Sequence, residues 1–305
     1  MLRRTLLTNA SYGFIGLGQM GGRMAPNLFK NADCDALYVY DTAAGSGDAV
    51  AKAAAGKAVH VCKDAAEVVA NCKTVITMLP NGHVVRDVYG SFWDKVQPGT
   101  LFIDSSTVDP QTPKDLAAEC AKRSARLVDA PVSGGVNAAA AGTLTFMVGG
   151  DDQTFNDAKK VLDAMGKNVV KCGDTGAGQV VKLCNNMILA QHMVAVSEAM
   201  LMGTRLGVDA GVLAGVVNTS TGRCWSSELY NPFPGVVANV PSSNNYAGGF
   251  GAALMLKDVK LAIDAADSVK LDVQGARNAC AVYQKMVDSG MGGLDFSGVL
   301  KHIDQ

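Results

Sequence analysis

The sequence predicts an α/β N-terminal domain, an all-α C-terminal domain and a long interdomain helix between them. Two observations predict this order. Apolar strands alternate with helical segments as far as Cys172, and no convincing strand follows that residue. A long stretch without proline, Gly176 to Gly207, lies where the pattern changes. We therefore expect one domain at residues 11–173 and another at residues 174–305.

The composition fits two folded domains and argues against several classes of partner. The chain has 305 residues, of which 48% are hydrophobic, and a net charge of −1 without a basic stripe, so we expect no nucleic-acid partner. The eight cysteines include no CxxC pair and the four histidines form no spaced set. We therefore expect no metal site and reduced thiols. Polar and charged residues interrupt the long helix, so we expect no membrane span.

The N-terminus has the composition of a short mitochondrial presequence. Residues 1–10 include two arginines and two threonines but no acidic residue. We therefore expect a mitochondrial protein. The alternative is an ordinary N-terminus on a cytoplasmic protein.

A glycine-rich motif follows the first predicted strand, which covers Tyr12–Ile15. The GxGxxG spacing is met by Gly16, Gly18 and Gly21, and a helical pattern comes next. Between a strand and a helix, such glycines let the backbone approach a pyrophosphate, and the helix N-terminus supplies N–H donors. The motif therefore predicts a Rossmann-type domain that binds a dinucleotide.

The second predicted strand, Ala36–Tyr40, ends at an acidic residue. Asp41 lies twenty residues after Gly21, where this fold places a carboxylate that accepts hydrogen bonds from the adenosine ribose. A carboxylate at this position would repel a 2′-phosphate, and no arginine follows it in the next residues. NAD is therefore the expected cofactor rather than NADP. The alternative is a glycine turn with a solvent-facing Asp41.

Two further predicted strands end in residues that we expect near the nicotinamide. The strand Lys73–Met78 ends at Leu79 and Pro80, and the strand Leu101–Ile103 leads into a polar segment that contains Thr107. Open α/β sheets bind ligands beyond the carboxyl ends of their strands. Leu79, Pro80 and Thr107 are therefore candidate cofactor contacts, with ordinary turn residues as the alternative.

A serine and two glycines follow the predicted strand Arg126–Ala130. Ser133, Gly134 and Gly135 offer a hydroxyl and exposed backbone N–H groups, which suit a carboxylate. The alternative is a turn that only connects two strands. The next segment, residues 137–142, is expected to be a loop of small residues without chemistry of its own.

The rest of the chain completes the predicted pattern. Further strands are expected at residues 59–62, 143–148 and 168–172. Helices are expected at residues 64–72, 110–123, 155–165, 179–206, 209–219, 252–268 and 273–289. Residues 220–251 are irregular and rich in aromatic side chains, so we expect an ordered loop that packs near a site.

The long helix is apolar on every side of a helical wheel, so we expect it to be buried between two bodies of protein. Lys182 and Asn186 are four residues apart and share one face, with Asn185 beside them. An amine and two amides in the first turns of a buried helix need a partner or a function that explains them. The alternative for Lys182 is a structural ion pair at a domain interface.

Four other polar residues are expected to lack a catalytic role. His192 and Glu198 are expected to be satisfied core groups. Asp258 and Lys260 are expected to be surface charges of a helix, although Asp258 could orient Lys257.

Several stretches together resemble a known family. The chain is similar to the β-hydroxyacid dehydrogenases and, within them, to the 3-hydroxyisobutyrate dehydrogenases of valine breakdown. The matching stretches span residues 13–258 and read GFIGLGQMG, ITMLP, IDSSTVDP, DAPVSGGVNAA, GTLTFMVGG, GQVVKLCNNM, TGRCWSSELYNPFPG, NNYAGGFG and LMLKD. The stretches within residues 220–251 point to the 3-hydroxyisobutyrate group in particular.

The resemblance implies NAD-dependent oxidation of (S)-3-hydroxyisobutyrate to methylmalonate semialdehyde. Lys182 would be the catalytic proton relay, and Asn186 would hold the substrate and this lysine in register. Ser133, Gly134 and Gly135 would bind the substrate carboxylate. The implied cofactor contacts are Gly16, Gly18, Met20, Gly21, Asp41, Leu79, Pro80, Thr107 and Lys257. The family's active site lies between the two domains, and a homo-oligomer, dimer or tetramer, is expected.

Two alternative functions remain open. A reductase of tartronate semialdehyde or glyoxylate would share every motif except the segment 220–251. A non-catalytic dinucleotide-binding module would have no need to retain Lys182 together with Asn186. The 6-phosphogluconate dehydrogenases place His-Asn where this chain has Asn185-Asn186, which argues against a sugar-phosphate substrate.

Overall fold

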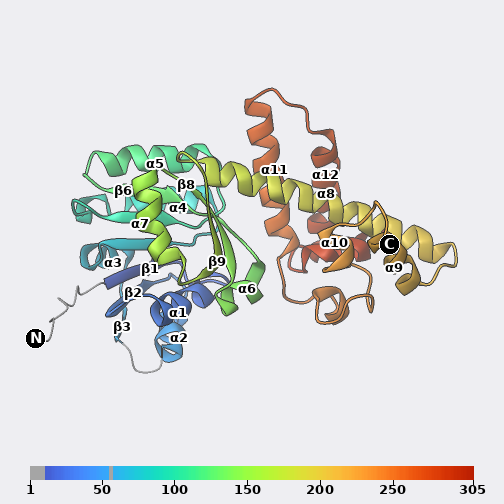
Figure 1. The fold of residues 1–305 in the computed structure, drawn as a ribbon, viewed down its shortest axis with the longest axis horizontal. Coiled ribbons are helices and arrows are strands. Elements are labelled where there is room, and N and C mark those ends of the chain that lie inside the picture. The colour runs from blue at the N-terminus through green and yellow to red at the C-terminus, as the bar shows by residue number, and fades with distance from the viewer. Residues whose placement is uncertain (1–10, 55–57) are drawn as a thin grey trace, which may run out of the picture. The chain divides into compact units, whose positions relative to one another are not determined.

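The computed structural model describes residues 11–54 and 58–305. The expected presequence, residues 1–10, lies outside these ranges. The chain forms two compact units (Figure 1). The first unit ends at Lys182 and the second begins at Leu183.

The first unit contains one nine-stranded sheet (Figure 1). Its strands are β1 (Ser11–Ile15), β2 (Ala36–Tyr40), β3 (Ala58–Val61), β4 (Thr74–Thr77), β5 (Leu101–Asp104), β6 (Arg126–Asp129), β7 (Val132–Ser133), β8 (Leu144–Gly149) and β9 (Gly166–Gly173). Parallel pairing gives the order β3-β2-β1-β4-β5-β6, and β8 then pairs antiparallel with β6 and β7. Every predicted strand is present. The strand order reverses between β1 and β4, which is where sheets of this type bind ligands.

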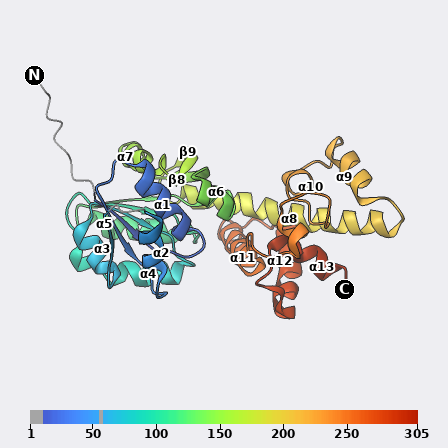
Figure 2. The same ribbon diagram turned by 90° about the horizontal axis from the view of Figure 1, so that it is seen from below.

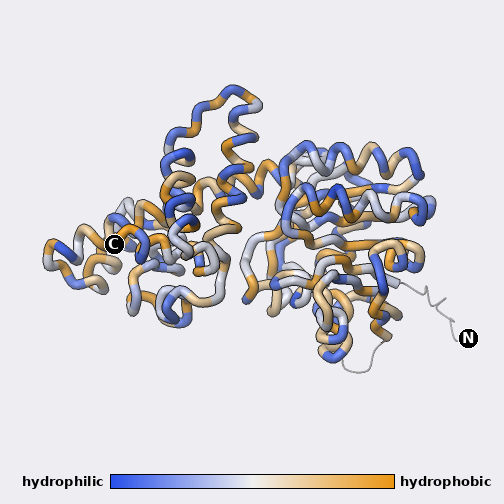
Figure 3. The backbone as a smooth tube through the Cα atoms, turned by 180° about the vertical axis from the view of Figure 1, so that it is seen from behind, coloured by the Kyte–Doolittle hydropathy of each residue, from blue (hydrophilic) through white to orange (hydrophobic). Residues whose placement is uncertain are grey.

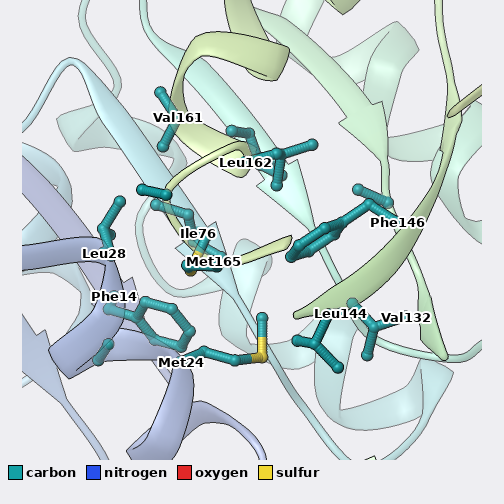
Figure 4. Packing of buried hydrophobic residues seen from close by; sticks show 14 of the residues in the cluster. Phe14, Met24, Leu28, Ile76, Val132, Leu144, Phe146, Val161, Leu162 and Met165 are labelled. Atoms are coloured by element: carbon teal, nitrogen blue, oxygen red, sulfur yellow. The ribbon is translucent and has the colours of Figure 1, made fainter. Parts of the chain in front are cut away.

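Helices cover both faces of this sheet. One face carries α1 (Gly21–Asn31), α2 (Ser46–Ala53), α6 (Gly135–Ala141) and α7 (Asp152–Leu162), and the other carries α3 (Ala65–Asn71), α4 (Gly82–Gly90) and α5 (Gln111–Ala121). Neighbouring strand residues point to opposite faces, so Phe14 enters the first core and Ile15 the second. Figure 4 shows the first core, where Phe14 and Met24 lie close together. In Figure 3 the helices alternate between blue and orange along their length, as expected for elements with one apolar face.

The predicted loop at residues 137–142 is wrong, because this segment belongs to α6. Alanine has the highest helix propensity of all residues, and four alanines in a row extend the helix to Ala141. Gly142, with φ 68°, ends it. The Asn27 side chain donates hydrogen bonds to the carbonyls of Ala139 (2.8 Å) and Ala140 (3.0 Å), which satisfies the end of the helix.

The helices that follow the sheet are α8 (Ala177–Arg205), α9 (Ala210–Asn218), α10 (Trp225–Glu228), α11 (Ala252–Ser268), α12 (Gln274–Met286) and α13 (Val299–Ile303). The helices predicted at 209–219, 252–268 and 273–289 are confirmed, whereas α10 and α13 were not predicted. Figures 1 and 2 show α11 and α12 side by side, and both pack against α8 through a core that includes Met193, Met255 and Tyr283.

The prediction that α8 is buried on every side is wrong. Its side chains Val181, Ile188 and Met202 are 40%, 49% and 63% exposed. His192 and Glu198 also lie on exposed positions of this helix, so they are not core groups. Across residues 11–54 and 58–305, no helix is both long enough and apolar enough to cross a membrane.

Candidate active site

The loop between β1 and α1 is shaped by its three glycines. A Cβ atom at Gly16 would lie 2.3 Å from the carbonyl oxygen of Met78, and one at Gly21 would lie 1.9 Å from the carbonyl oxygen of Gly16. A Cβ atom at Gly18, in contrast, would meet no atom of the described residues within 4 Å. Gly16 and Gly21 therefore let strand, loop and helix pack closely, and Gly18 leaves open the space that an approaching phosphate needs.

The N-terminus of α1 directly follows the glycine-rich loop. Met20 occupies the cap position, and no side chain of the described residues accepts a hydrogen bond as a cap. The backbone N–H groups of Gly22 and Arg23 donate to the carbonyls of Gly18 and Met20, each at 3.0 Å, and they lie at the positive end of the helix dipole. This end of α1 therefore suits a pyrophosphate.

Asp41 is tied to the same glycine-rich loop. Its carboxylate accepts hydrogen bonds from the backbone N–H groups of Leu17 (2.5 Å) and Ala43 (2.7 Å). Leu17 lies between Gly16 and Gly18. Since a carboxylate has about four acceptor positions, Asp41 can still accept from ribose hydroxyls.

Asp104, at the end of β5, links the two segments that were predicted to contact the nicotinamide. Its Oδ1 accepts from the hydroxyls of Thr77 (2.7 Å) and Ser106 (2.6 Å). The Ser106 hydroxyl in turn accepts from the backbone N–H of Leu79 (2.9 Å). Burial raises the pKa of Asp104, whose Oδ2 has no hydrogen-bond partner among the described residues. The network fixes Leu79 beside the segment that leads to Thr107.

Pro80 and Thr107 differ in exposure. Pro80 is exposed and Thr107 half-buried, each just beyond the end of its strand. These positions are compatible with a ligand contact at the carboxyl edge of the sheet.

Asp129, at the end of β6, caps the start of α8. Its fully buried carboxylate accepts from the backbone N–H groups of Gly176 (2.6 Å) and Gln179 (2.9 Å). Burial, partly offset by these hydrogen bonds, raises the pKa of Asp129 to about 6. The carboxylate anchors the helix that carries Lys182.

The segment predicted to hold a carboxylate has the backbone shape for this task. Gly134 (φ 131°) and Gly135 (φ 68°) adopt positive φ values, which glycine tolerates without strain. Both glycines are exposed, and Ser133 beside them is half-buried at the end of β7. Exposed N–H groups in such a turn attract anions.

Lys182 and Asn186 lie one turn apart on α8, and both are buried. The Asn186 amide is held from two sides within the second unit. Its Nδ2 donates to Asp258 Oδ2 (2.6 Å), and its Oδ1 accepts from Asn185 Nδ2 (3.0 Å). Asn185, whose role the sequence left open, therefore orients the amide of Asn186.

The interpretation of Asp258 as a surface charge is wrong, because it is only 2% exposed. It lies on α11, where its Oδ1 is 3.0 Å from Lys257 Nζ. Asp258 thus lies between Asn186 and Lys257, and its ion pair with Lys257 is compatible with the expectation that it could orient this lysine. Lys260 is exposed as expected, and it donates to the side chain of Gln284 (2.7 Å).

The aromatic segment 220–251 is anchored by one buried carboxyl. Asp295 accepts from the Tyr230 hydroxyl (3.0 Å) and the Phe250 backbone N–H (2.7 Å). The Tyr230 ring stacks on Trp225 and on Phe296, with ring centroids 4.7 Å and 5.6 Å apart. Burial raises the pKa of Asp295.

Three buried acids that contact predicted site residues or the segments around them were not named as site residues: Asp104 and Asp129 in the first unit and Asp258 in the second. For Asp104 and Asp129 the sequence did hold a signal, since Asp104 directly follows the predicted strand Leu101–Ile103 and Asp129 is the last residue but one of the predicted strand Arg126–Ala130. For Asp258 the signal is its place between Met255, Leu256 and Val259 on an apolar helix.

Comparison with known proteins adds independent information. A model described as the NAD binding domain of 6-phosphogluconate dehydrogenase matches residues 11–173, and one described as NAD-binding of NADP-dependent 3-hydroxyisobutyrate dehydrogenase matches residues 176–303. Mitochondrial 3-hydroxyisobutyrate dehydrogenases of Mus musculus and Homo sapiens are 46% and 45% identical to this chain, over 98% of its length and 89% and 88% of theirs.

A solved structure agrees with these matches. The 3-hydroxyisobutyrate dehydrogenase of Mycobacterium tuberculosis, determined with L-serine, has a TM-score of 0.90 and 38% identity, and the comparison covers 97% of this chain and 99% of that one. The mitochondrial names of the curated relatives agree with the predicted location. The matches show an oxidoreductase that binds NAD(P). The chain therefore belongs to the 3-hydroxyisobutyrate dehydrogenase family.

Proposed function

We propose that this chain oxidises (S)-3-hydroxyisobutyrate to methylmalonate semialdehyde with NAD, in mitochondrial valine breakdown. One observation carries the proposal: buried Lys182 and Asn186 lie one turn apart on α8, in a chain that matches 3-hydroxyisobutyrate dehydrogenases over almost its full length. A module without catalytic function would not need this pair.

The glycine-rich loop fits a dinucleotide, since Gly18 leaves open space at the positive N-terminal end of α1. Asp41 would accept from the ribose hydroxyls and would repel a 2′-phosphate, which favours NAD over NADP. Leu79, Pro80 and Thr107 would contact the nicotinamide half. When bound, NAD supplies the hydride acceptor of the reaction.

The substrate would be held by its carboxylate and activated at its hydroxyl. Ser133, Gly134 and Gly135 would donate hydrogen bonds to the carboxylate. Lys182 would accept the hydroxyl proton as general base, and Asn186 would keep substrate and lysine in register. Lys257, oriented by Asp258, would contact the cofactor.

We also propose a homo-oligomer, a dimer or tetramer, formed through the helical part of the chain. Near the end of α8 and on α9, Met202, Leu206, Val212 and Val216 are 63%, 77%, 60% and 58% exposed. Apolar exposure on adjoining helices is typical of an interface. Met202→Glu should lower the molar mass found by light scattering, whereas an unchanged mass would argue against this surface.

The reaction is tested by measuring NADH absorbance over a panel of hydroxy acids, with NAD and with NADP. The highest kcat/KM is expected for (S)-3-hydroxyisobutyrate with NAD. Faster turnover of tartronate semialdehyde or glyoxylate, measured in the reducing direction, would replace the proposed substrate. A folded protein without activity on any of them would support a non-catalytic module.

A further inference from the structure

Gln179 is a fully buried side chain at the start of α8 to which the proposed mechanism gives no task. Its Oε1 accepts a hydrogen bond from the backbone N–H of Val108 (3.1 Å). Its Nε2 donates to the carbonyl oxygen of Ser106 (2.8 Å). One amide therefore binds the peptide groups on both sides of Thr107, a proposed contact of the nicotinamide.

The backbone of Gln179 also makes a hydrogen bond to a neighbouring element. Its N–H donates to Asp129 Oδ2 (2.9 Å), at the end of β6. A Cβ atom at the preceding residue, Gly178, would lie 2.2 Å from the carbonyl oxygen of Met147 in β8. The first turn of α8 is thus fixed against two strands, and Gln179 connects this turn to the segment around Thr107.

Lys182 follows Gln179 by three residues on the same helix. Three residues correspond to a rise of about 4.5 Å and slightly less than one full turn, so the two side chains leave the helix on nearly the same face. A shift of the first turn relative to Thr107 would therefore shift Lys182 by a similar amount.

We infer that Gln179 is a positioning residue, which sets the placement of Lys182 relative to the nicotinamide contact at Thr107. This inference rests on the proposed function, in which Lys182 takes up the hydroxyl proton. Gln179 itself would touch neither substrate nor cofactor. It would act through the two peptide groups and the helix turn that it joins.

The first test is Gln179→Leu, which keeps the approximate side-chain volume and removes both hydrogen bonds. The expected result is a fall in kcat of about 10- to 100-fold, because misplacing a reacting group by about 1 Å can cost about 100-fold in rate. The KM for substrate and the binding of NADH, followed by its fluorescence, should change little, since the carboxylate turn and the glycine-rich loop are untouched.

A second variant, Gln179→Glu, tests the positioning role of Gln179 even if Gln179→Leu fails to fold. An ionised carboxylate can accept from Val108 but cannot donate to Ser106, whereas a protonated carboxyl group can do both, as the amide does. The ratio of the variant's kcat to the wild-type kcat should therefore rise as the pH falls. The nearby Asp104 and Asp129 are present in the wild type and in the variant, so their titration cancels in this ratio.

Gln191→Leu is the matched control. Gln191 lies on the same helix, but its amide donates to the carbonyl of Met187 one turn earlier (3.1 Å). This variant should keep the wild-type kcat. If folded Gln179→Leu also kept it, or if the kcat ratio of Gln179→Glu did not depend on pH, the inference would be overturned.

Failure of the inference and failure of the proposed function give different results. The proposed function fails if the wild type oxidises no hydroxy acid or if Lys182→Ala retains full turnover in the same assay. The inference alone fails if the wild type is active, Lys182→Ala is inactive, and the folded Gln179 variants match the wild type.

Discussion

Replacing Asp129 with asparagine should remove one component of the pH dependence of stability. Burial raises the pKa of this carboxyl from 3.8 to about 6, so the folded state binds the proton more tightly than the unfolded state does. The stability gained in this way is fully present below about pH 4 and is lost as the pH rises through about 6. A pKa difference of about 2 corresponds to about 3 kcal/mol.

Asp129→Asn keeps the shape of the protonated acid and cannot ionise. An amide oxygen can accept one of the hydrogen bonds from Gly176 and Gln179, so the variant loses an acceptor but avoids burying a charge. Urea unfolding of both proteins at several pH values measures the free energy of unfolding. This quantity contains both the loss of the acceptor and the gain from avoiding a buried charge.

Between about pH 4 and pH 7, the wild type should lose about 3 kcal/mol more free energy of unfolding than the variant. Asp295, whose pKa is also raised by burial, titrates in both proteins and cancels in the difference. If the two stability curves ran parallel across this range, the assignment of a raised pKa to Asp129 would be refuted.

Three further predictions concern the cofactor, the substrate and the aromatic segment. Asp41→Ser should lower the ratio of kcat/KM with NAD to that with NADP, and an unchanged ratio would show that Asp41 does not select the cofactor. Asp258→Asn should lower kcat by at least about 10-fold, because the Asn186 amide loses a charged acceptor worth about 1.5–3 kcal/mol; steady-state kinetics test this, and a wild-type kcat would contradict it. Tyr230→Phe should lower the free energy of unfolding by about 1–3 kcal/mol, because one hydrogen bond to buried Asp295 is lost; an unchanged denaturation midpoint would argue against this anchor.

Local patterns were sufficient to predict every strand of the sheet except the two-residue strand β7. Strands such as Ala36–Tyr40 are short apolar runs between glycine-rich or polar turns, and their positions follow from composition and period alone. The helix α6 was missed because its alanines were taken as a loop, although their propensity favours a helix. The exposed side of α8 could not be predicted. Apolar residues lie all around this helix, so the sequence does not reveal which side is covered by neighbouring elements.

The candidate site was predictable only where its residues follow one another in a motif. Lys182 and Asn186 share a helix face, so their spacing was informative. The contacts that support them join residues far apart in sequence, such as Asn186 with Asp258 and Gln179 with Ser106. No local period encodes such pairs, which is why Asp258 was interpreted as a surface charge.

The most direct test of the account is the turnover of Lys182→Ala with (S)-3-hydroxyisobutyrate and NAD, measured by NADH absorbance beside the wild type. If Lys182 is the general base, kcat should fall by about 100- to 10,000-fold while the variant stays folded and still binds NADH. A folded variant with near-wild-type kcat would contradict the proposed role of Lys182 and, with it, the mechanism built on α8.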